Sequence, residues 1–274
     1  MPQLSEQDEG VQAAADGSRH HSITWTIFRG CERLDRFVAG NHPRATIFHP
    51  QWLSIRAQCA GMAHAAQSAR GLLVDIGCGN TPFEDLFRER IERYVGMDYP
   101  ATARLVGASR AQVHATARHL PLADASVETL LLTEVLEHLR EPGPVLEELS
   151  RVLKPGGVLI VSAPMIYNVH GAPHDFFRFT PDGLRYVLER AGFQIVKLWP
   201  QGYAGTMLGL MTNNFLTVVF GRTRLLRAIR WTVLLPVLPL VFAWNNLLGL
   251  LLDAVVREPS FSFNHVAIAR QGAA

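Results

Sequence analysis

Two glycines lie between a strand-like run and a helix-like run at Val74–Asn80, and this turn constrains the fold more than any other segment. Gly77 and Gly79 allow the backbone to turn tightly and let a ligand come into van der Waals contact, which a Cβ atom would block. Asp98 ends the next predicted strand, 19 residues after Gly79. A carboxylate at that place can accept hydrogen bonds from two ribose hydroxyls. Strand, turn, helix and spaced acid together predict a nucleoside-binding site.

The residues around this turn alternate between short apolar strands and helices. Such alternation predicts an α/β fold with a doubly wound, parallel sheet and helices on both faces. The predicted strands are 71–76, 94–97, 111–114, 127–133, 158–163, 193–198 and 262–269. The predicted helices are 50–67, 82–90, 142–153 and 180–191, with a turn at 154–157.

The kind of nucleoside ligand is narrowed by one residue after the turn. A dinucleotide fingerprint, G-x-G-x-x-G, would place glycine at position 82, where this chain has Pro82. Proline suits the first turn of a helix but not a close contact between helix and strand beneath a pyrophosphate. This difference argues against NAD or FAD.

Composition excludes several classes of protein. The formal net charge is only +2, so a generally basic nucleic-acid coat is excluded. The three cysteines form no C-x-x-C pair, so neither a disulfide scaffold nor a cysteine-based zinc site is expected. This cysteine content predicts a reducing compartment. The polar, acidic start has no apolar signal region. These features predict a cytoplasmic protein.

The chain is expected to divide into five segments. Residues 1–22 form a disordered tail, 23–70 an N-terminal helical cap and 71–200 the ligand-binding core. Residues 201–258 form an apolar helical insertion that contains arginines, and 259–274 supply the last core strand and the C-terminus.

The insertion breaks the regular alternation. Between Lys197 and Asp253 there are 55 residues without Asp or Glu, and they include uncharged runs of 24 and 22 residues. Each run is long enough to cross a bilayer, which needs about 20 residues. The strands on either side should pair in one sheet, so both ends of the insertion must lie on one side of any membrane. A hairpin of two spans would carry the arginines between the runs across, against the positive-inside bias. These arginines are Arg222, Arg224, Arg227 and Arg230.

The favoured interpretation is therefore a pair of helices at the cytoplasmic membrane interface, with the arginines facing anionic headgroups. The alternatives are a soluble helical lid or a homodimer interface, and a true membrane span.

Five motifs in order resemble the class I S-adenosylmethionine-dependent methyltransferases, and are most similar to the type 11 group. They are Asp75-Ile76-Gly77-Cys78-Gly79, Asp98, Leu120–Glu128, Thr133–Leu139 and Leu153–Gly157. The resemblance covers roughly residues 70–200. It implies a Rossmann-like sheet of seven strands that ends in an antiparallel hairpin, with S-adenosyl-L-methionine as cofactor.

The resemblance also implies which residues contact the cofactor. Asp75, Gly77 and Gly79 would line the methionine end, with Cys78 as a small filler beside it. Asp98 and Tyr99 would hold the ribose, and Thr116 and Ala117 would contact the adenine. Thr133 and Glu134 would close the site. This chain departs from the family pattern at two places. A third glycine is replaced at Thr81 or Pro82, and Thr116 stands where the family usually has an acid.

An acceptor site is predicted in the segment His170–Thr180, which leaves the ligand-bearing edge of the sheet. His174 is the candidate general base, with His170 as the weaker candidate. Phe176 and Phe177 would form a wall, and Arg178 would bind an anionic group. The alternative is a local ion pair of His174-Asp175 with Arg178 that fixes the loop, with the phenylalanines in the core.

No metal site is predicted in this segment. His170 and His174 are four residues apart, but Gly171 and Pro173 between them argue against the helix that would bring them together. Glu137-His138 is interpreted as structure at the start of a helix.

The sequence therefore predicts a cytoplasmic methyltransferase that acts on a small or lipid-linked acceptor, at oxygen, near the membrane surface. One alternative is a soluble small-molecule or sugar methyltransferase with the insertion as lid. Another is a non-catalytic scaffold that retains the fold. No nucleic-acid partner is expected, because the arginines lie among aliphatic residues without a stacking surface.

Overall fold

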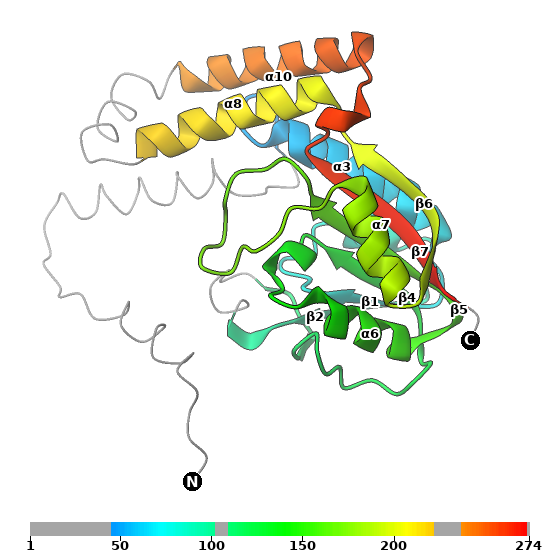
Figure 1. The fold of residues 1–274 in the computed structure, drawn as a ribbon. Helices are drawn as coiled ribbons and strands as arrows, with labels where there is room; N and C mark the ends of the chain where they lie inside the picture. The colour runs from blue at the N-terminus through cyan, green and yellow to red at the C-terminus, as the bar shows by residue number, and fades with distance from the viewer. Residues whose placement is uncertain (1–44, 102–108, 222–236, 273–274) are drawn as a thin grey trace, which may run out of the picture. The chain divides into compact units, whose positions relative to one another are not determined.

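The computed structural model describes residues 45–101, 109–221 and 237–272. The predicted tail, the first part of the predicted cap and the four arginines of the insertion lie outside these residues. Among the described residues, seven strands form one sheet in the order β3-β2-β1-β4-β5-β7-β6 (Figure 1). The strands are β1 Leu72–Ile76, β2 Arg93–Asp98, β3 Val113–His114, β4 Val127–Thr133, β5 Leu153–Pro164, β6 Phe193–Gln201 and β7 Asn264–Gln271.

The direction of the strands confirms the predicted fold class. β1 pairs in parallel with β2 and β4, β2 with β3, and β4 with β5. β7 runs antiparallel to both β5 and β6, which forms the terminal hairpin. The sheet is therefore the Rossmann-like, doubly wound sheet of seven strands that the sequence predicts.

Helices cover both faces of the sheet (Figure 1). α6 Pro142–Val152 and α7 Pro181–Arg190 pack on one apolar cluster, which they share with β4 and β5. α3 Trp52–Ala65 and the short α4 Glu84–Phe87 pack on a second cluster. α7 begins where Thr180 Oγ1 accepts a hydrogen bond of 3.0 Å from the backbone N–H of Gly183, and Pro181 supplies the first helical residue.

Two predicted elements have different limits in the structure. The predicted helix 82–90 is helical only over Glu84–Phe87, because Thr81 takes a left-handed backbone with φ of 53° and the flanking hydrogen bonds join residues three apart. β5 begins at Leu153 instead of residue 158. Val127 pairs with Leu153 and Thr129 with Val158, so the predicted 154–157 turn is a bulge within the strand.

The described residues of the insertion include two long helices between β6 and β7, namely α8 Ala204–Gly221 and α10 Leu238–Val255, which lie side by side (Figure 1). Glycines allow their close approach: a Cβ atom at Gly205 would lie 2.2 Å from the carbonyl oxygen of Gly249. Asp253 of α10 accepts hydrogen bonds from the backbone N–H groups of Gly205 (2.7 Å) and Thr206 (3.1 Å) at the start of α8. Close backbone contact thus holds the two helices together, and Asp253 of α10 caps the N-terminus of α8.

We predict that Gly205→Ala destabilises the protein by about 1–3 kcal/mol, because the added methyl group overpacks the contact between the two helices. Thermal and urea unfolding measure this effect. Gly143→Ala is the matched control, since a Cβ atom at this position of α6 meets no atom within 4 Å. Equal stability of the two variants would contradict the described contact.

Candidate functional site

The carboxyl ends of β1, β2, β4 and β5 meet at one edge of the sheet, which is where open α/β sheets bind ligands. The glycine turn follows β1, Asp98 ends β2, and Thr133 ends β4 with Glu134 directly after it. The backbone N–H groups of Gly77 (2.8 Å) and Cys78 (3.0 Å) both donate to the carbonyl oxygen of Met97 in β2. The fold therefore brings the predicted cofactor residues of three strands to one place.

The glycine turn has the backbone that the sequence predicts. Gly77 and Gly79 have φ of 75° and 50°, in the left-handed region. A Cβ atom at Gly77 would lie 2.5 Å from Val135, whereas a Cβ atom at Gly79 meets no described atom within 4 Å. The first glycine is thus required for packing, and the second leaves open space for a ligand.

Cys78 lies buried between the two glycines, and its Sγ would be 2.8 Å from a Cβ atom at Gly96. Burial raises the pKa of its thiol to about 12. A thiol with a raised pKa is mainly neutral near pH 7, and the place of Cys78 beside the cofactor stays a prediction.

Asp75 lies beneath the turn and has one carboxyl oxygen without a hydrogen-bond partner among the described residues. The residue is 1% exposed, and the Tyr94 hydroxyl donates to its Oδ2. Its Oδ1 has no hydrogen-bond partner among the described residues. Burial raises the pKa of Asp75 to about 7. A buried carboxylate oxygen without a partner suits a cationic ligand group, such as the ammonium of a methionine moiety.

Asp98 is 4% exposed, and it accepts hydrogen bonds from the backbone N–H of Tyr99 (2.8 Å) and from Ser109 Oγ (3.1 Å). A carboxylate has about four acceptor positions, so a ribose diol still finds acceptors there. Tyr99 is 55% exposed, Thr116 is exposed in a short bridge, and Ala117 packs partly on the core. Their contacts with a nucleoside stay predictions.

Glu134 follows β4 with φ of 54°. Its Oε1 accepts two hydrogen bonds of 2.6 Å, one from Ser162 Oγ in β5 and one from Asn264 Nδ2 in β7. Burial, followed by the nearby Glu137 carboxylate, raises the pKa of Glu134. Ser162 and Asn264 were not predicted, because only the pairing of β5 with β7 brings them beside Glu134.

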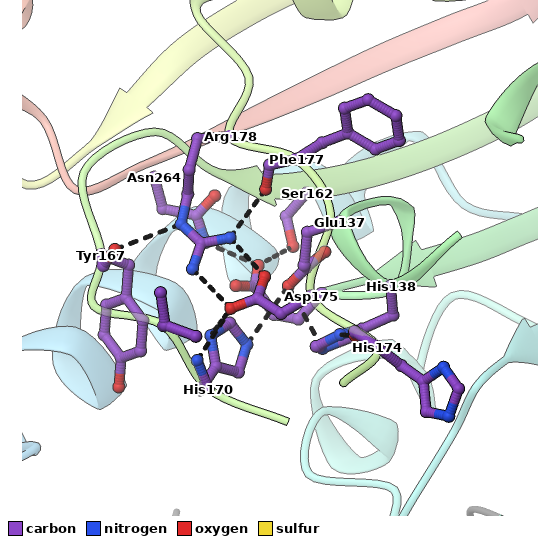
Figure 2. Close-up of polar contacts among 12 residues, drawn as sticks. Glu137, His138, Ser162, Tyr167, His170, His174, Asp175, Phe177, Arg178 and Asn264 are labelled. Carbon is purple, nitrogen blue, oxygen red and sulfur yellow. Dashed lines mark hydrogen bonds and ion pairs between the residues drawn. The ribbon is translucent and has the colours of Figure 1, made fainter. Parts of the chain in front are cut away.

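Arg178 holds the predicted acceptor loop together (Figure 2). Its guanidinium binds both carboxylate oxygens of Asp175 at 2.5 and 2.8 Å. Its other three N–H groups donate to the carbonyl oxygens of Tyr167, Asn168 and Phe177. All five donors are used, and the guanidinium holds the pKa of Asp175 well below its usual range. The structure thus shows an ion pair of Arg178 with Asp175, as the alternative interpretation expected, and anion binding by Arg178 stays a prediction.

The two predicted imidazoles of this loop lie differently. His174 is exposed, and its ring points away from Asp175 and Glu137 in Figure 2. His170 Nε2 lies 3.7 Å from Glu137 Oε1, and this carboxylate raises the pKa of His170. Phe176 and Phe177 are 36% and 38% exposed at the rim of the loop. The roles of His174 as base and of the phenylalanines as wall stay predictions.

Glu137 and His138 were interpreted as structure at the start of a helix, but in the structure their side chains also form a cluster with His170. They belong to a short 3-10 helix, η2 Leu136–His138, directly after β4. This turn places Glu137 and His138 beside His170, and Figure 2 shows the three side chains converging. The signal was present in the sequence as an acid and a histidine beyond a central strand, but the partner histidine lies over 30 residues away.

Comparisons with known proteins agree with this arrangement. Residues 74–161 match the family described as "Methyltransferase domain". A probable S-adenosylmethionine-dependent methyltransferase of Mycolicibacterium smegmatis is 38% identical over 96 residues, which cover 34% of this chain and 37% of that protein. The chain therefore matches well under half the length of this relative.

Solved structures show the fold. The [4+2]-cyclase SpnF has 19% identity and a TM-score of 0.53, with 86% of each chain covered. The putative methyltransferase in a complex with the Haloferax volcanii Trm112 activator has 18% identity and a TM-score of 0.52, with 89% of this chain and 96% of that chain covered. Since one of the two is described as a cyclase, the fold alone does not assign a reaction.

We predict that Arg178→Lys loosens the acceptor loop, because an ammonium has three donors and cannot reproduce the planar, five-donor arrangement. Hydrogen–deuterium exchange of residues 165–179 should speed up by about tenfold or more, which corresponds to the loss of one or two charged hydrogen bonds. Arg185→Lys is the matched control, since Arg185 makes only an exposed 3.8 Å pair with Glu189. Unchanged exchange in Arg178→Lys would contradict the structural role.

Proposed function

We propose that this chain, which carries a class I S-adenosylmethionine-dependent methyltransferase domain, transfers a methyl group to a hydroxyl of a small or lipid-linked acceptor. The proposal rests on three features that lie at one edge of the sheet. They are the open turn at Gly79, the Asp75 oxygen without a hydrogen-bond partner among the described residues, and the buried Asp98. The match of residues 74–161 to the methyltransferase domain supports the same cofactor.

When bound, S-adenosylmethionine supplies a methyl group on a sulfonium, so the reaction depends mainly on the positioning of the two partners. In the proposal, Asp75 and the glycine turn hold the cationic end of the cofactor and Asp98 holds its ribose. Glu134 is fixed by two hydrogen bonds at the edge between the cofactor side and the acceptor side. A pre-set carboxyl group there keeps water and side chains ordered where the methyl group would cross.

The acceptor side is proposed to be the loop 165–180. An oxygen nucleophile must lose a proton, and the loop offers the imidazoles of His174 and His170. The insertion lies beside this loop, because Asn214 of α8 donates to Asn168 Oδ1 (2.8 Å). Asn214 also accepts a hydrogen bond from Gln51, whose Oε1 accepts one from the Tyr167 hydroxyl (3.1 Å). These contacts support the proposal that the insertion covers the acceptor side. They do so whether the insertion binds a membrane or, as the alternative, is a soluble lid.

We predict that Asp98→Asn lowers the affinity for S-adenosylhomocysteine by about tenfold to a hundredfold, because an amide replaces a charged acceptor of hydrogen bonds. Titration calorimetry measures the affinity. Asp85→Asn is the control, since Asp85 is exposed on α4 and pairs only with Arg88. Binding that is equal in Asp98→Asn and wild type would refute the proposed ribose contact, and an absence of binding in folded wild type would favour the scaffold alternative.

We further propose that α8 and α10 dock on the anionic cytoplasmic face of a membrane. α10 is the helix, among the described residues, that is long and apolar enough to cross a bilayer, yet only 22% of it is buried. Large apolar side chains that are more than half exposed line the pair, namely Leu208, Phe215, Val218, Leu240, Trp244 and Leu251. The four arginines between the helices in the sequence match the charge of such a surface. Both ends of the insertion join the sheet at the paired residues Gln201 and Asn264, which argues against a single span. A hairpin of two spans would carry the four arginines across the membrane, against the positive-inside bias.

A sedimentation assay with vesicles tests this proposal. Wild type should pellet with anionic vesicles, less so at high salt, and Trp244→Ser should weaken binding by about tenfold through the loss of buried apolar area. Tyr186→Ser is the control, because Tyr186 is equally exposed on α7. Failure to pellet with vesicles would favour the soluble lid, and pelleting without vesicles would identify aggregation.

A further inference from the structure

Glu137 is fully buried, and neither of its carboxylate oxygens has a hydrogen-bond partner among the described residues. A buried, unpartnered carboxylate is unfavourable and rare in native proteins. Figure 2 shows that the side chains of His138 and His170 converge on it. The three potential ligand atoms lie within 4.8 Å of one another. A bound cation, or protonation of one of the two imidazoles, would balance this carboxylate.

The spacing fits an ion better than direct hydrogen bonds. Glu137 Oε1 lies 3.8 Å from His138 Nε2 and 3.7 Å from His170 Nε2, which is too long for a hydrogen bond. Two ligands at about 2.1 Å from a tetrahedral ion lie about 3.4 Å apart. The two distances from Glu137 therefore exceed the spacing of two ligands on one ion by a few tenths of an ångström, and all three atoms lie within 4.8 Å of one another.

The far side of each imidazole is already engaged. His138 Nδ1 lies 2.5 Å from the carbonyl oxygen of His174. His170 Nδ1 lies 3.3 Å from the carbonyl oxygen of Asn168 and 3.5 Å from Asp175 Oδ2. Since carbonyl and carboxylate oxygens only accept, each Nδ1 carries the proton. Each Nε2 then directs its lone pair toward the buried carboxylate, which is the outer support that metal-binding histidines usually have.

We propose that Glu137, His138 and His170 bind a divalent first-row transition cation, of the Zn²⁺, Fe²⁺ or Mn²⁺ class. Two imidazoles and one carboxylate suit such ions and leave coordination positions open. Arg178 serves the site indirectly, because it holds Asp175 and Asn168 against His170.

The role of the ion rests on the proposed function, whereas its binding does not. A divalent cation lowers the pKa of a hydroxyl that coordinates it. With His170 bound to the ion, His174 is the imidazole left as base, so the acceptor O–H proton would pass to His174 or to solvent. The O–CH₃ bond would form and the methyl–sulfur bond would break, with both electrons of the broken bond staying on sulfur. The site would therefore select acceptors that carry a hydroxyl group able to reach the ion.

Titration with Co²⁺, followed by its visible absorption, tests the binding without any cofactor. His20 and His21 form a second possible ligand pair in the sequence, so all proteins carry His20→Ala and His21→Ala. We expect one Co²⁺ per chain, displaced by Zn²⁺ and not by Mg²⁺, since imidazole ligands disfavour Mg²⁺. Glu137→Gln and His170→Ala should each weaken binding at least about tenfold. His64→Ala on α3 is the matched control and should bind as the background protein does.

Glu137→Gln keeps the side-chain volume and removes the buried charge, so its fold should persist, which circular dichroism verifies. Equal Co²⁺ affinity in Glu137→Gln, His170→Ala and His64→Ala would overturn the proposal, as would no binding in the folded background protein. Titration of S-adenosylhomocysteine into the same proteins separates the two claims. Binding of Co²⁺ without binding of S-adenosylhomocysteine would support the metal site and contradict the proposed function. Binding of S-adenosylhomocysteine without binding of Co²⁺ would contradict the metal site alone.

Discussion

Negative charge is buried at the edge where the parallel strands end, and the rest of the site is arranged around it. Asp75, Asp98 and Glu137 are each no more than 4% exposed, and burial together with the Glu137 carboxylate raises the pKa of Glu134. Carboxylates in such surroundings are costly unless protonated or paired. The pKa of Asp75 is raised to about 7, and atoms of Asp75 and Glu137 lack hydrogen-bond partners among the described residues. A cationic cofactor on one side and a divalent ion on the other would each satisfy one of these orphan groups.

The helical insertion is tied to the same edge. β6 ends and β7 begins at the paired residues Gln201 and Asn264, and Asn264 also donates to Glu134. α8 then reaches the acceptor loop through Asn214, and α10 is held to α8 by Gly249 and Asp253. A membrane or an acceptor that displaced the two helices would therefore also displace the loop that carries His170. This connection would link the proposed membrane docking to the proposed acceptor side.

Local patterns in the sequence predicted the sheet well and the site in part. The turn at Gly77 and Gly79 and the acid at Asp98 were recognised because each depends on residues close in the sequence. The helix predicted at 82–90 was too long, because hydrogen bonds between residues three apart replace the α-helical pattern around Glu84–Phe87. The cluster at Glu137 was missed because His170 reaches it only through the loop fixed by Arg178. Asn264 was missed because strand pairing alone brings it to Glu134, 130 residues away.

A crystal structure of the protein with S-adenosylhomocysteine and Co²⁺ tests the central claim most directly. The account predicts the ribose on Asp98, and the cation, located by its anomalous scattering, between Glu137, His138 and His170. The sulfur should point toward Glu134, close enough for an acceptor oxygen at the ion to lie about 3–3.5 Å from a transferred methyl group. A nucleoside whose sulfur faces away from Glu137, or a cation bound elsewhere in the chain, would contradict the account.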